Sequence, residues 1–406
     1  MELVRQKYLD RILKWKDKHV IKIITGVRRS GKSHILNQYK EVLQHQQHVT
    51  SKQIIDYDFS DEKFANLDRT SLHKAILGRA IKNKINYVIL DEIQEIKEFE
   101  RVVISLFENK SYKFDIYLTG SNSKLFSASL ATLFTGRNIE IKIYPFSLSE
   151  YVDWMKLNNA KHIDKYESFE KYVLLGGMPI ILELNDDKEL IKERLLKVVD
   201  DTLEEDIKRR HKIYGFDEFK KFTEYVMKHN GTIFSTLNIS NYLKSNNRTK
   251  TSHITISKYL SYLCESLLIY KLNFYNTKSK AILDVSSKYY SVDTGLKNVF
   301  NDFGIEDYGR LLENIVFIEL LRRGFSVYVA KLRGNKEVDF VAKKEKELIY
   351  IQVADRLSTE AIKEREYGNL NRLRDNYKKI VITRDRLNFI NDKGIETINI
   401  VDWLLE

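Results

Sequence analysis

The sequence has little of what secreted and membrane proteins need. It holds one cysteine, Cys264, among 406 residues, which excludes an internal disulfide framework and a zinc site built from several thiolates. The most apolar run, residues 173–182, is interrupted by glycine and proline and is too short to span a bilayer. Charged residues in the first eleven positions break up the apolar core that a signal peptide requires. We therefore expect a cytoplasmic protein with no membrane partner.

Acidic residues are scarce in one part of the chain. Residues 207–300 contain sixteen Lys or Arg against six Asp or Glu, whereas the net charge of the whole chain is +11. A positive field concentrated in under a quarter of the chain favours a polyanionic partner, most simply nucleic acid. A solvated basic surface is the alternative. The length predicts two to four domains, and 43% hydrophobic content is typical of a globular protein.

A phosphate-binding loop is the strongest motif. Residues 19–25 form a β-branched run that predicts a buried strand, and residues 33–44 have an amphipathic helical pattern. Between them, Gly26-Val-Arg-Arg-Ser-Gly31-Lys32-Ser33 matches G-x-x-x-x-G-K-[ST] at every fixed position. The glycines let backbone N–H groups surround phosphate, and the helix N-terminus adds its dipole. Strand, loop and helix in this order predict a P-loop that binds ATP.

Individual roles follow from this motif. Lys32 should reach the β- and γ-phosphates, and the Ser33 hydroxyl should ligate Mg²⁺. Arg28 and Arg29 flank the centre of the loop, where one could contact phosphate, although solvated loop arginines are the ordinary case. The residues predicted to bind ATP are Gly26, Arg29, Ser30, Gly31, Lys32, Ser33 and Ser121.

Two carboxylates end a second apolar strand. Residues 87–90 are followed by Asp91 and Glu92, the position of a Walker B motif. Asp91 is predicted to hold Mg²⁺ together with Ser33, and Glu92 to polarise the attacking water. An ordinary acidic strand end is the alternative.

Two further residues are candidates for catalysis. The apolar strand 115–119 runs into Gly-Ser121-Asn122, where Asn122, or else Ser121, would sense the γ-phosphate; a turn-forming role is equally compatible. Arg137 precedes a strand over 139–143 and suits an arginine finger that reaches the nucleotide of a neighbouring subunit. A surface arginine at a strand end is the alternative. The finger implies a homo-oligomer.

The middle of the chain is predicted to be helical. Helices over 167–175 and 188–208, separated by a turn at 176–179, suggest a lid over the nucleotide or a plain linker. Helices over 217–229, 239–243 and 253–269, then strands over 268–275 and 288–292, predict a winged helix. Its candidate nucleic-acid ligands are Arg248, Lys250, Ser252, Thr255 and Lys258. A winged helix can also bind protein alone.

The C-terminal part follows an α-β-β-β-α-β order: a helix over 309–323, strands over 327–331, 337–343 and 348–353, a helix over 361–373 and a strand over 380–383. This order resembles the PD-(D/E)xK nuclease fold. The resemblance implies metal carboxylates at Glu313 and Asp339. The third motif is degenerate, because Gln352 replaces a carboxylate and Ala354 replaces the lysine. We expect a nuclease-like scaffold that no longer cuts DNA.

Taken together, several motifs resemble one bacterial and archaeal group of AAA+-type ATPases with a winged-helix segment. They are Leu-Asp-Glu-Ile-Gln94, Leu-Thr-Gly-Ser121, Thr-Gly-Arg137, Pro145-Phe-Ser-Leu-Ser-Glu150 and Gly176-Gly-Met-Pro179. The resemblance implies an α/β P-loop NTPase with a parallel sheet of strand order 5-1-4-3-2 and catalysis by Glu92. The predicted domains are an ATPase core (1–150), a helical lid (151–206), a winged helix (207–300) and a nuclease-like domain (301–406).

The leading hypothesis for function is an Mg²⁺-dependent ATPase that works as a switch or motor on DNA. One alternative is a signalling or defence ATPase whose C-terminal parts bind protein partners. The other is an ATP-gated nuclease, which would need substitute residues for Gln352 and Ala354.

Overall fold

The computed structural model describes residues 2–64, 66–121, 134, 136–158, 163–236, 239–240, 252–305, 307–332, 334, 336–391 and 393–406, except for the side chains of 283–286. These residues divide into two compact units. The N-terminal unit comprises residues 2–144 with 265–267, and the C-terminal unit comprises 145–264 with 268–406. Each unit is described by itself below.

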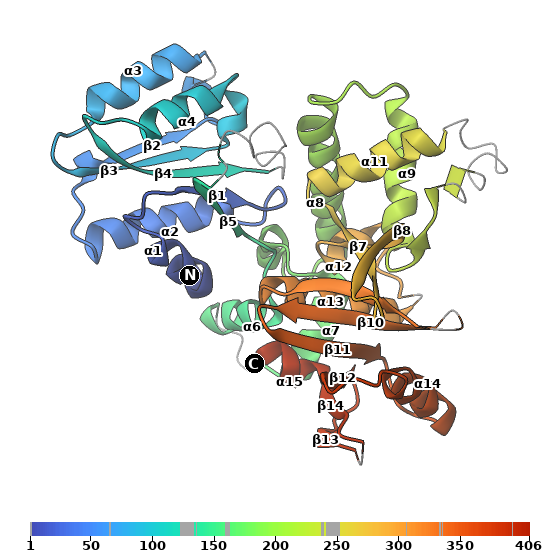
Figure 1. The fold of residues 1–406 in the computed structure, drawn as a ribbon. Helices are drawn as coiled ribbons and strands as arrows, with labels where there is room; N and C mark the ends of the chain where they lie inside the picture. The colour runs from blue at the N-terminus through green and yellow to red at the C-terminus, as the bar shows by residue number, and fades with distance from the viewer. Residues whose placement is uncertain are drawn as a thin grey trace. The chain divides into compact units, whose positions relative to one another are not determined.

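The N-terminal unit is built on a five-stranded sheet in which every neighbouring pair is parallel (Figure 1). In sheet order its strands are β2 (Ile54–Asp58), β3 (Ile85–Asp91), β4 (Lys113–Gly120), β1 (Ile21–Thr25) and β5 (Asn138–Lys142). The predicted order 5-1-4-3-2 is therefore confirmed. The position of the second strand, β2, was not predicted, because its mixed sequence Ile-Ile-Asp-Tyr-Asp has no clear period.

Helices cover both faces of this sheet. Helices α1 (Gln6–Lys14) and α2 (Lys32–His45) pack on one face, and α3 (Arg69–Arg79) and α4 (Phe99–Phe107) pack on the other (Figure 1). Side chains of β1 alternate between the two apolar layers, and all five of its residues are buried. A strand buried on both faces is mostly apolar, which is why this run could be found in the sequence; its one charged residue, Lys22, is buried against Asp115. The described part of the unit also contains three short 3₁₀ turns, η1 (Ser51–Gln53), η2 (Glu62–Phe64) and η3 (Ile93–Glu95).

The C-terminal unit begins with a helical part: α6 (Leu148–Leu157), α7 (Lys165–Leu175), η5 (Pro179–Leu184), α8 (Lys188–Asp201), η6 (Thr202–Lys208), α9 (Phe216–Lys228) and α11 (His253–Glu265). The helix predicted over 188–208 is α8 continued by the π-helical segment η6. The helix predicted to reach residue 269 ends earlier, since Leu267 has a positive φ of 61° that no right-handed helix accommodates.

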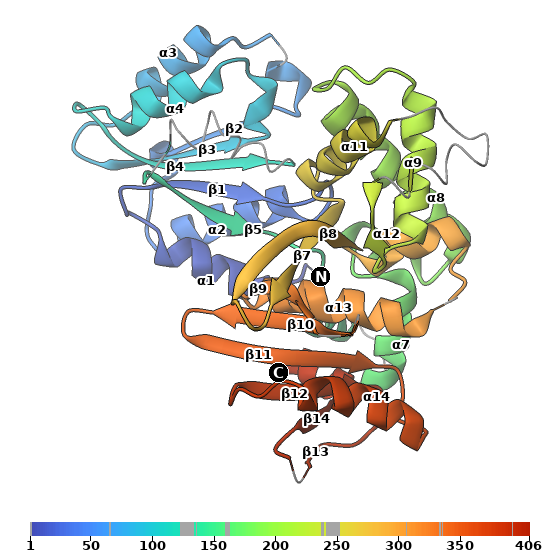
Figure 2. The ribbon, with the colours of Figure 1, turned by 45° about the vertical axis from the view of Figure 1, so that its right-hand side comes forward.

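A nine-stranded mixed sheet forms the rest of this unit, in the order β13-β14-β12-β11-β10-β9-β7-β8-β6 (Figure 2). In chain order its strands are β6 (Ile233–Phe234), β7 (Ile269–Asn276), β8 (Ala281–Ser291), β9 (Ser326–Lys331), β10 (Glu337–Lys344), β11 (Glu347–Ala354), β12 (Lys378–Thr383), β13 (Phe389–Ile390) and β14 (Glu396–Asn399). Its helices are α12 (Thr294–Asn298), α13 (Tyr308–Arg322), α14 (Glu360–Asn371) and α15 (Ile400–Leu405), with the 3₁₀ turn η7 (Val299–Asn301). The predicted α-β-β-β-α-β order is present as α13-β9-β10-β11-α14-β12.

The predicted hairpin differs from the observed one. Strand β8 begins at residue 281 rather than 288, because β7 and β8 stay paired down to a tight turn at 277–280. Strand β7 also pairs in parallel with β9. The hairpin and the C-terminal strands therefore share one sheet and one compact unit, and the division at residue 300 stays a prediction.

The glycine pair after α7 makes a close contact with the start of α12. A Cβ on Gly176 would lie 2.0 Å from Asp293 Oδ1, and one on Gly295 would lie 1.9 Å from the Leu175 carbonyl oxygen. The Asp293 carboxylate accepts hydrogen bonds from the backbone N–H groups of Gly177 (2.7 Å), Gly295 (2.9 Å) and Leu296 (3.2 Å). The motif predicted as a simple turn thus holds the helical part against the sheet.

Candidate functional site

The loop between β1 and α2 has the backbone that its glycines permit. Gly31 has a φ of 95°, which favours glycine. A Cβ on Gly26 would lie 2.4 Å from the carbonyl oxygen of Ile143, so a larger residue would displace the loop. Arg29 also has a positive φ, 66°, and its side chain is exposed. The buried Ser30 hydroxyl has no hydrogen-bond partner among the described residues, which leaves a donor free beside the loop.

Lys32 lies inside the curve of this loop and is only 5% exposed. Its Nζ donates to the carbonyl oxygens of Gly26 (3.2 Å) and Val27 (3.5 Å) and lies 3.6 Å from Glu92 Oε1. These contacts are all long for a charged donor. A phosphate oxygen can therefore compete for the ammonium at the place where the motif predicts it.

The two predicted metal ligands lie together. Asp91, at the end of β3, is buried and is hydrogen-bonded to the side chains of Ser33 and Thr119. Burial raises the pKa of Asp91, while these hydrogen bonds oppose the rise. A serine hydroxyl beside a carboxylate, both next to the phosphate loop, is an oxygen set of the kind that Mg²⁺ prefers. The residues present thus fit the metal.

Glu92 is presented by a left-handed backbone with φ 52°, a conformation that costs a non-glycine residue about 1–3 kcal/mol and is concentrated at functional sites. Its backbone N–H donates to Thr119 Oγ1 at 2.9 Å. Gln94 donates through Nε2 to the Glu92 carboxylate. The carboxylate therefore faces Lys32 instead of following the strand direction.

Two supporting residues were not predicted. Arg5 is buried, and its guanidinium donates to the carbonyl oxygens of Ser30 (3.0 Å) and Tyr144 (2.9 Å), which positions the phosphate loop. Thr119 joins the end of β4 to Asp91 and Glu92. The role of Thr119 could have been predicted, because it is a polar residue at the end of an apolar strand. The role of Arg5 could not, because Arg5 is far from the phosphate loop in the sequence.

The remaining predicted ATPase residues are Ser121, Asn122 and Arg137. Ser121 is buried directly after β4, and Asn122 lies outside the described residues. Arg137 precedes β5, is 43% exposed and pairs with Glu108 at 2.9 Å. The register pairs Asn138 with the start of β1 and Lys142 with its end. Arg137 therefore lies at the edge of the sheet opposite the P-loop, about 17 Å away along a five-residue strand, too far to serve its own nucleotide.

The predicted nucleic-acid residues lie on and before α11. Arg248 and Lys250 are outside the described residues. The Ser252 hydroxyl accepts a hydrogen bond from the Thr255 N–H (3.2 Å) and so caps the helix, and Lys258 is exposed.

A basic and aromatic segment packs beside this helix. The His211 ring stacks on Tyr262 of α11 with centroids 3.8 Å apart, and Lys212 lies 5.3 Å from the ring centre of Tyr214, which is 76% exposed. Cationic side chains interleaved with aromatic rings are typical of surfaces that bind nucleic acid.

The three residues of the degenerate nuclease motif converge within the C-terminal unit. Asp339 accepts a hydrogen bond from the N–H of Val353, next to Gln352, at 2.8 Å. Glu313 on α13 accepts from Tyr290 at 2.7 Å and lines a cavity of about 540 Å³ with Ala354. An unpredicted residue, Lys288 on β8, is buried among these carboxylates.

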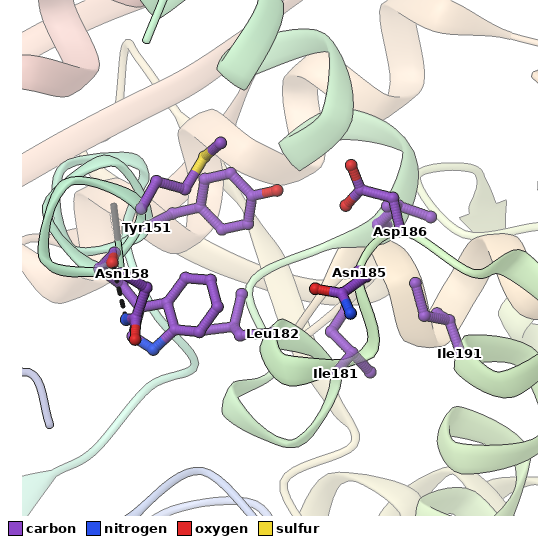
Figure 3. Close-up of a pocket in the computed structure, with 10 residues that line it drawn as sticks. Tyr151, Asn158, Ile181, Leu182, Asn185, Asp186 and Ile191 are labelled. Atoms are coloured by element: carbon purple, nitrogen blue, oxygen red, sulfur yellow. Dashed lines mark hydrogen bonds between the residues drawn. The ribbon is translucent and has the colours of Figure 1, made fainter. Parts of the chain in front are cut away.

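A second cavity, of about 360 Å³ and lined by both apolar and polar side chains, lies in the helical part (Figure 3). Tyr151 of α6 and Asn158, directly after that helix, line one side, and Asn185 and Asp186 after η5 line the other. Burial raises the pKa of Tyr151, and the nearby Asp186 carboxylate adds to the rise. Among the described residues, no group of three His, Cys, Asp or Glu side chains is arranged to hold a metal. In the same residues we find no helix with the length and apolarity to cross a membrane.

Comparison with known proteins agrees with the N-terminal geometry. A family profile described as an AAA domain matches residues 18–152, and a profile for a domain of unknown function matches residues 166–323. The Walker-type ATPase PABY2304 of Pyrococcus abyssi has a similar fold, with a TM-score of 0.51 at 16% identity over 74% of this chain and 96% of that chain. The N-terminal unit is thus a P-loop ATPase domain of the AAA class.

Two relatives extend the similarity along the chain. An uncharacterized protein of Haemophilus influenzae is 38% identical over 99% of this chain and 98% of its own length. The uncharacterized protein MJ1544 of Methanocaldococcus jannaschii is 34% identical over 94% of this chain and 85% of its own length. The chain belongs to the family of these two proteins.

Proposed function

We propose that this protein hydrolyses ATP with Mg²⁺ and uses the cycle as a switch or motor on nucleic acid. The observation that carries the ATPase part is the contact between Ser33 and Asp91, with Glu92 next in sequence and 3.6 Å from Lys32. Metal, phosphate and water would meet at this point.

The roles of the side chains follow from their positions. The loop amides and the N-terminus of α2 bind the phosphates. Lys32 exchanges its long contacts with carbonyl groups and Glu92 for the terminal phosphate, which frees the Glu92 carboxylate to accept a proton from water. When bound, Mg²⁺ between Ser33 and Asp91 would neutralise phosphate charge.

Nucleic acid is the proposed partner because of the α11 surface. Thr255, Lys258 and Tyr262 lie at helical spacings of three and four residues, so they share one side of α11. His211 and Lys212 continue that side next to the exposed Tyr214. Cations would neutralise phosphates, and the rings would offer stacking faces to unpaired bases.

The test is the ATPase rate and binding affinity with duplex and with single-stranded DNA, at several salt concentrations. We expect DNA to bind and to change the rate. Each lost phosphate contact lowers the slope of log affinity against log salt by about 0.9. Replacing Arg248, Lys250 and Lys258 together should therefore flatten it by roughly two to three units for duplex DNA. ATP turnover with no DNA binding would retain the enzyme and remove the DNA role.

Oligomerisation forms a separate part of the proposal. Since Arg137 lies too far from its own P-loop, it would act on the nucleotide of a neighbouring subunit. Mixing Arg137→Ala with Lys32→Ala subunits should then restore part of the activity. Activity that stays absent at every mixing ratio would remove the trans role.

The C-terminal domain is proposed as a nuclease-like scaffold that binds without cutting. Gln352 and Ala354 lack the charge and the amine that cleavage requires. Purified protein with Mg²⁺, ATP and linear or branched DNA should give no products.

A further inference from the structure

The carboxylates of the C-terminal unit surround a lysine from a distant part of the sequence. Lys288 lies on β8, and its Nζ is 2.5 Å from Glu337 Oε1 on β10. It interacts electrostatically with Glu313 on α13 and Asp339 on β10 as well. Tyr290, two residues further along β8 and on the same face, donates to Glu313 at 2.7 Å. The cluster thus joins three elements through one ammonium group.

Burial makes this ammonium necessary. Lys288 is 4% exposed, Asp339 is buried with it, and Glu313 is half-buried at the cavity wall. Buried carboxylates require a cation or several hydrogen bonds to stay ionised. Burial acts against the charged lysine, yet Glu313, Asp339 and Glu337 outweigh it and raise the pKa of Lys288. The lysine therefore stays charged at neutral pH and balances the cluster.

The rest of the cluster does not suit a divalent ion. The Gln352 side chain is uncharged and its residue is 6% exposed, so it adds no negative charge to attract a divalent ion. One Asp339 oxygen is already occupied by the Val353 N–H. The described acidic side chains here include no three arranged as metal ligands. An ammonium in their midst would also repel a second cation.

We propose that the Lys288 ammonium is the permanent cation of this cluster, in the place where a metal-dependent nuclease of this fold holds its divalent ion. The proposal rests on the proposed non-cutting role of the domain and deepens it, because it names the group that replaces the metal. It also gives the hairpin β7–β8 a contact with β10 and α13 in addition to the pairing of β7 with β9. The lysine holds them together in the way that a structural metal would.

Mn²⁺ is a suitable probe, because bound Mn²⁺ is counted directly by electron paramagnetic resonance. The experiment uses the full-length protein without nucleotide. Wild type and Asp339→Asn should bind the same number of ions, since the cluster takes none. Lys288→Met should bind one more ion than Lys288→Met/Asp339→Asn, because removing the ammonium exposes the carboxylates. Lys288→Arg keeps the charge and should behave as wild type.

Two results would overturn the proposal: an ion bound by wild type and lost in Asp339→Asn, or no ion gained by folded Lys288→Met. If Lys288→Met fails to fold, the comparison of wild type with Asp339→Asn still decides. A DNA-cutting assay on the same samples distinguishes a failure of the lysine proposal from a failure of the proposed non-cutting role. An ion bound without cutting removes the lysine proposal alone, whereas cutting that disappears in Asp339→Asn also removes the non-cutting role.

Discussion

Lys32 in the N-terminal unit and Lys288 in the C-terminal unit are almost equally buried, 5% and 4% exposed, and each lies beside a glutamate. Their surroundings differ. Lys32 contacts backbone carbonyl groups at 3.2 and 3.5 Å and Glu92 at 3.6 Å, in a loop that contains residues with positive φ. Lys288 on β8 is 2.5 Å from Glu337 on β10, with two further carboxylates near it.

The comparison shows that a buried lysine can either bind a ligand or stabilise the fold, depending on its contacts. Long contacts to neutral oxygens leave much of the charge of Lys32 available to a phosphate. Glu337 pairs directly with Lys288, and Glu313 and Asp339 also interact with its charge. We therefore expect substitutions at the first lysine to change chemistry and substitutions at the second to change stability.

The largest effect is expected for Lys32→Ala. The residue contributes few contacts to the core, so the fold should remain, but ATP turnover should become undetectable. Removing one donor aimed at developing charge alone costs about 10²–10³ in rate. ATP hydrolysis and circular dichroism measured on the same sample check both parts. Normal hydrolysis by a folded variant would contradict the ATPase assignment.

Glu92→Gln should bind ATP normally and hydrolyse it slowly. Glutamine keeps the shape of the side chain and removes the proton acceptor, an effect on the order of 10²–10⁴ in rate. Binding of a fluorescent ATP analogue and single-turnover hydrolysis separate the two steps. Glu41→Gln is the matched control, because Glu41 is exposed on α2 and lies about 13 Å along the helix from Lys32. Equal losses of binding and rate in Glu92→Gln would make Glu92 a structural residue.

Lys288→Met should leave ATP chemistry in the N-terminal unit intact and destabilise the C-terminal unit. Removing one partner of a buried ion pair costs about 3–5 kcal/mol, because the remaining charges lose their compensation. Urea unfolding measures the change in free energy. Lys258→Met on exposed α11 is the matched control and should stay within about 0.5 kcal/mol of wild type. A similar small change in Lys288→Met would show that Lys288 is not needed for stability.

The sequence predicts features that depend on adjacent residues, and it does not predict contacts between residues far apart in the chain. The P-loop and Asp91-Glu92 are short patterns that can be recognised from adjacent residues. The parallel strands that hold them are rich in β-branched and other apolar residues. Arg5 acts on a carbonyl group 139 positions away. Lys288 was counted with the surface charge, although tertiary packing buries it. No periodicity in the sequence distinguishes a buried lysine from an exposed one.

Asp293 adds a third buried charge to the comparison, one that neither a ligand nor a lysine ammonium balances directly. Three backbone N–H groups surround its carboxylate. Burial nevertheless raises the pKa of Asp293 from 3.8 to about 6, since it outweighs these hydrogen bonds and the more distant Arg322. The folded protein thus holds this proton more tightly than the unfolded chain does.

The smallest effect is therefore a pH dependence. Because the folded-state pKa is the higher one, the stabilisation from protonated Asp293 is complete below about pH 4 and is lost as pH rises through about 6. At most it amounts to about 3 kcal/mol, from 1.36 kcal/mol per pKa unit. Asp293→Asn does not titrate, so its unfolding free energy minus that of wild type should increase between pH 4 and 7, whatever constant cost the amide adds. Exposed Asp302→Asn is the control: hydrogen bonding to Lys192 lowers the pKa of Asp302, so its difference from wild type should move in the opposite direction. If the unfolding free energy of Asp293→Asn minus that of wild type does not change from pH 4 to 7, burial does not raise the pKa of Asp293. The three backbone N–H groups would then compensate this buried carboxylate fully, as the surrounding carboxylates compensate Lys288.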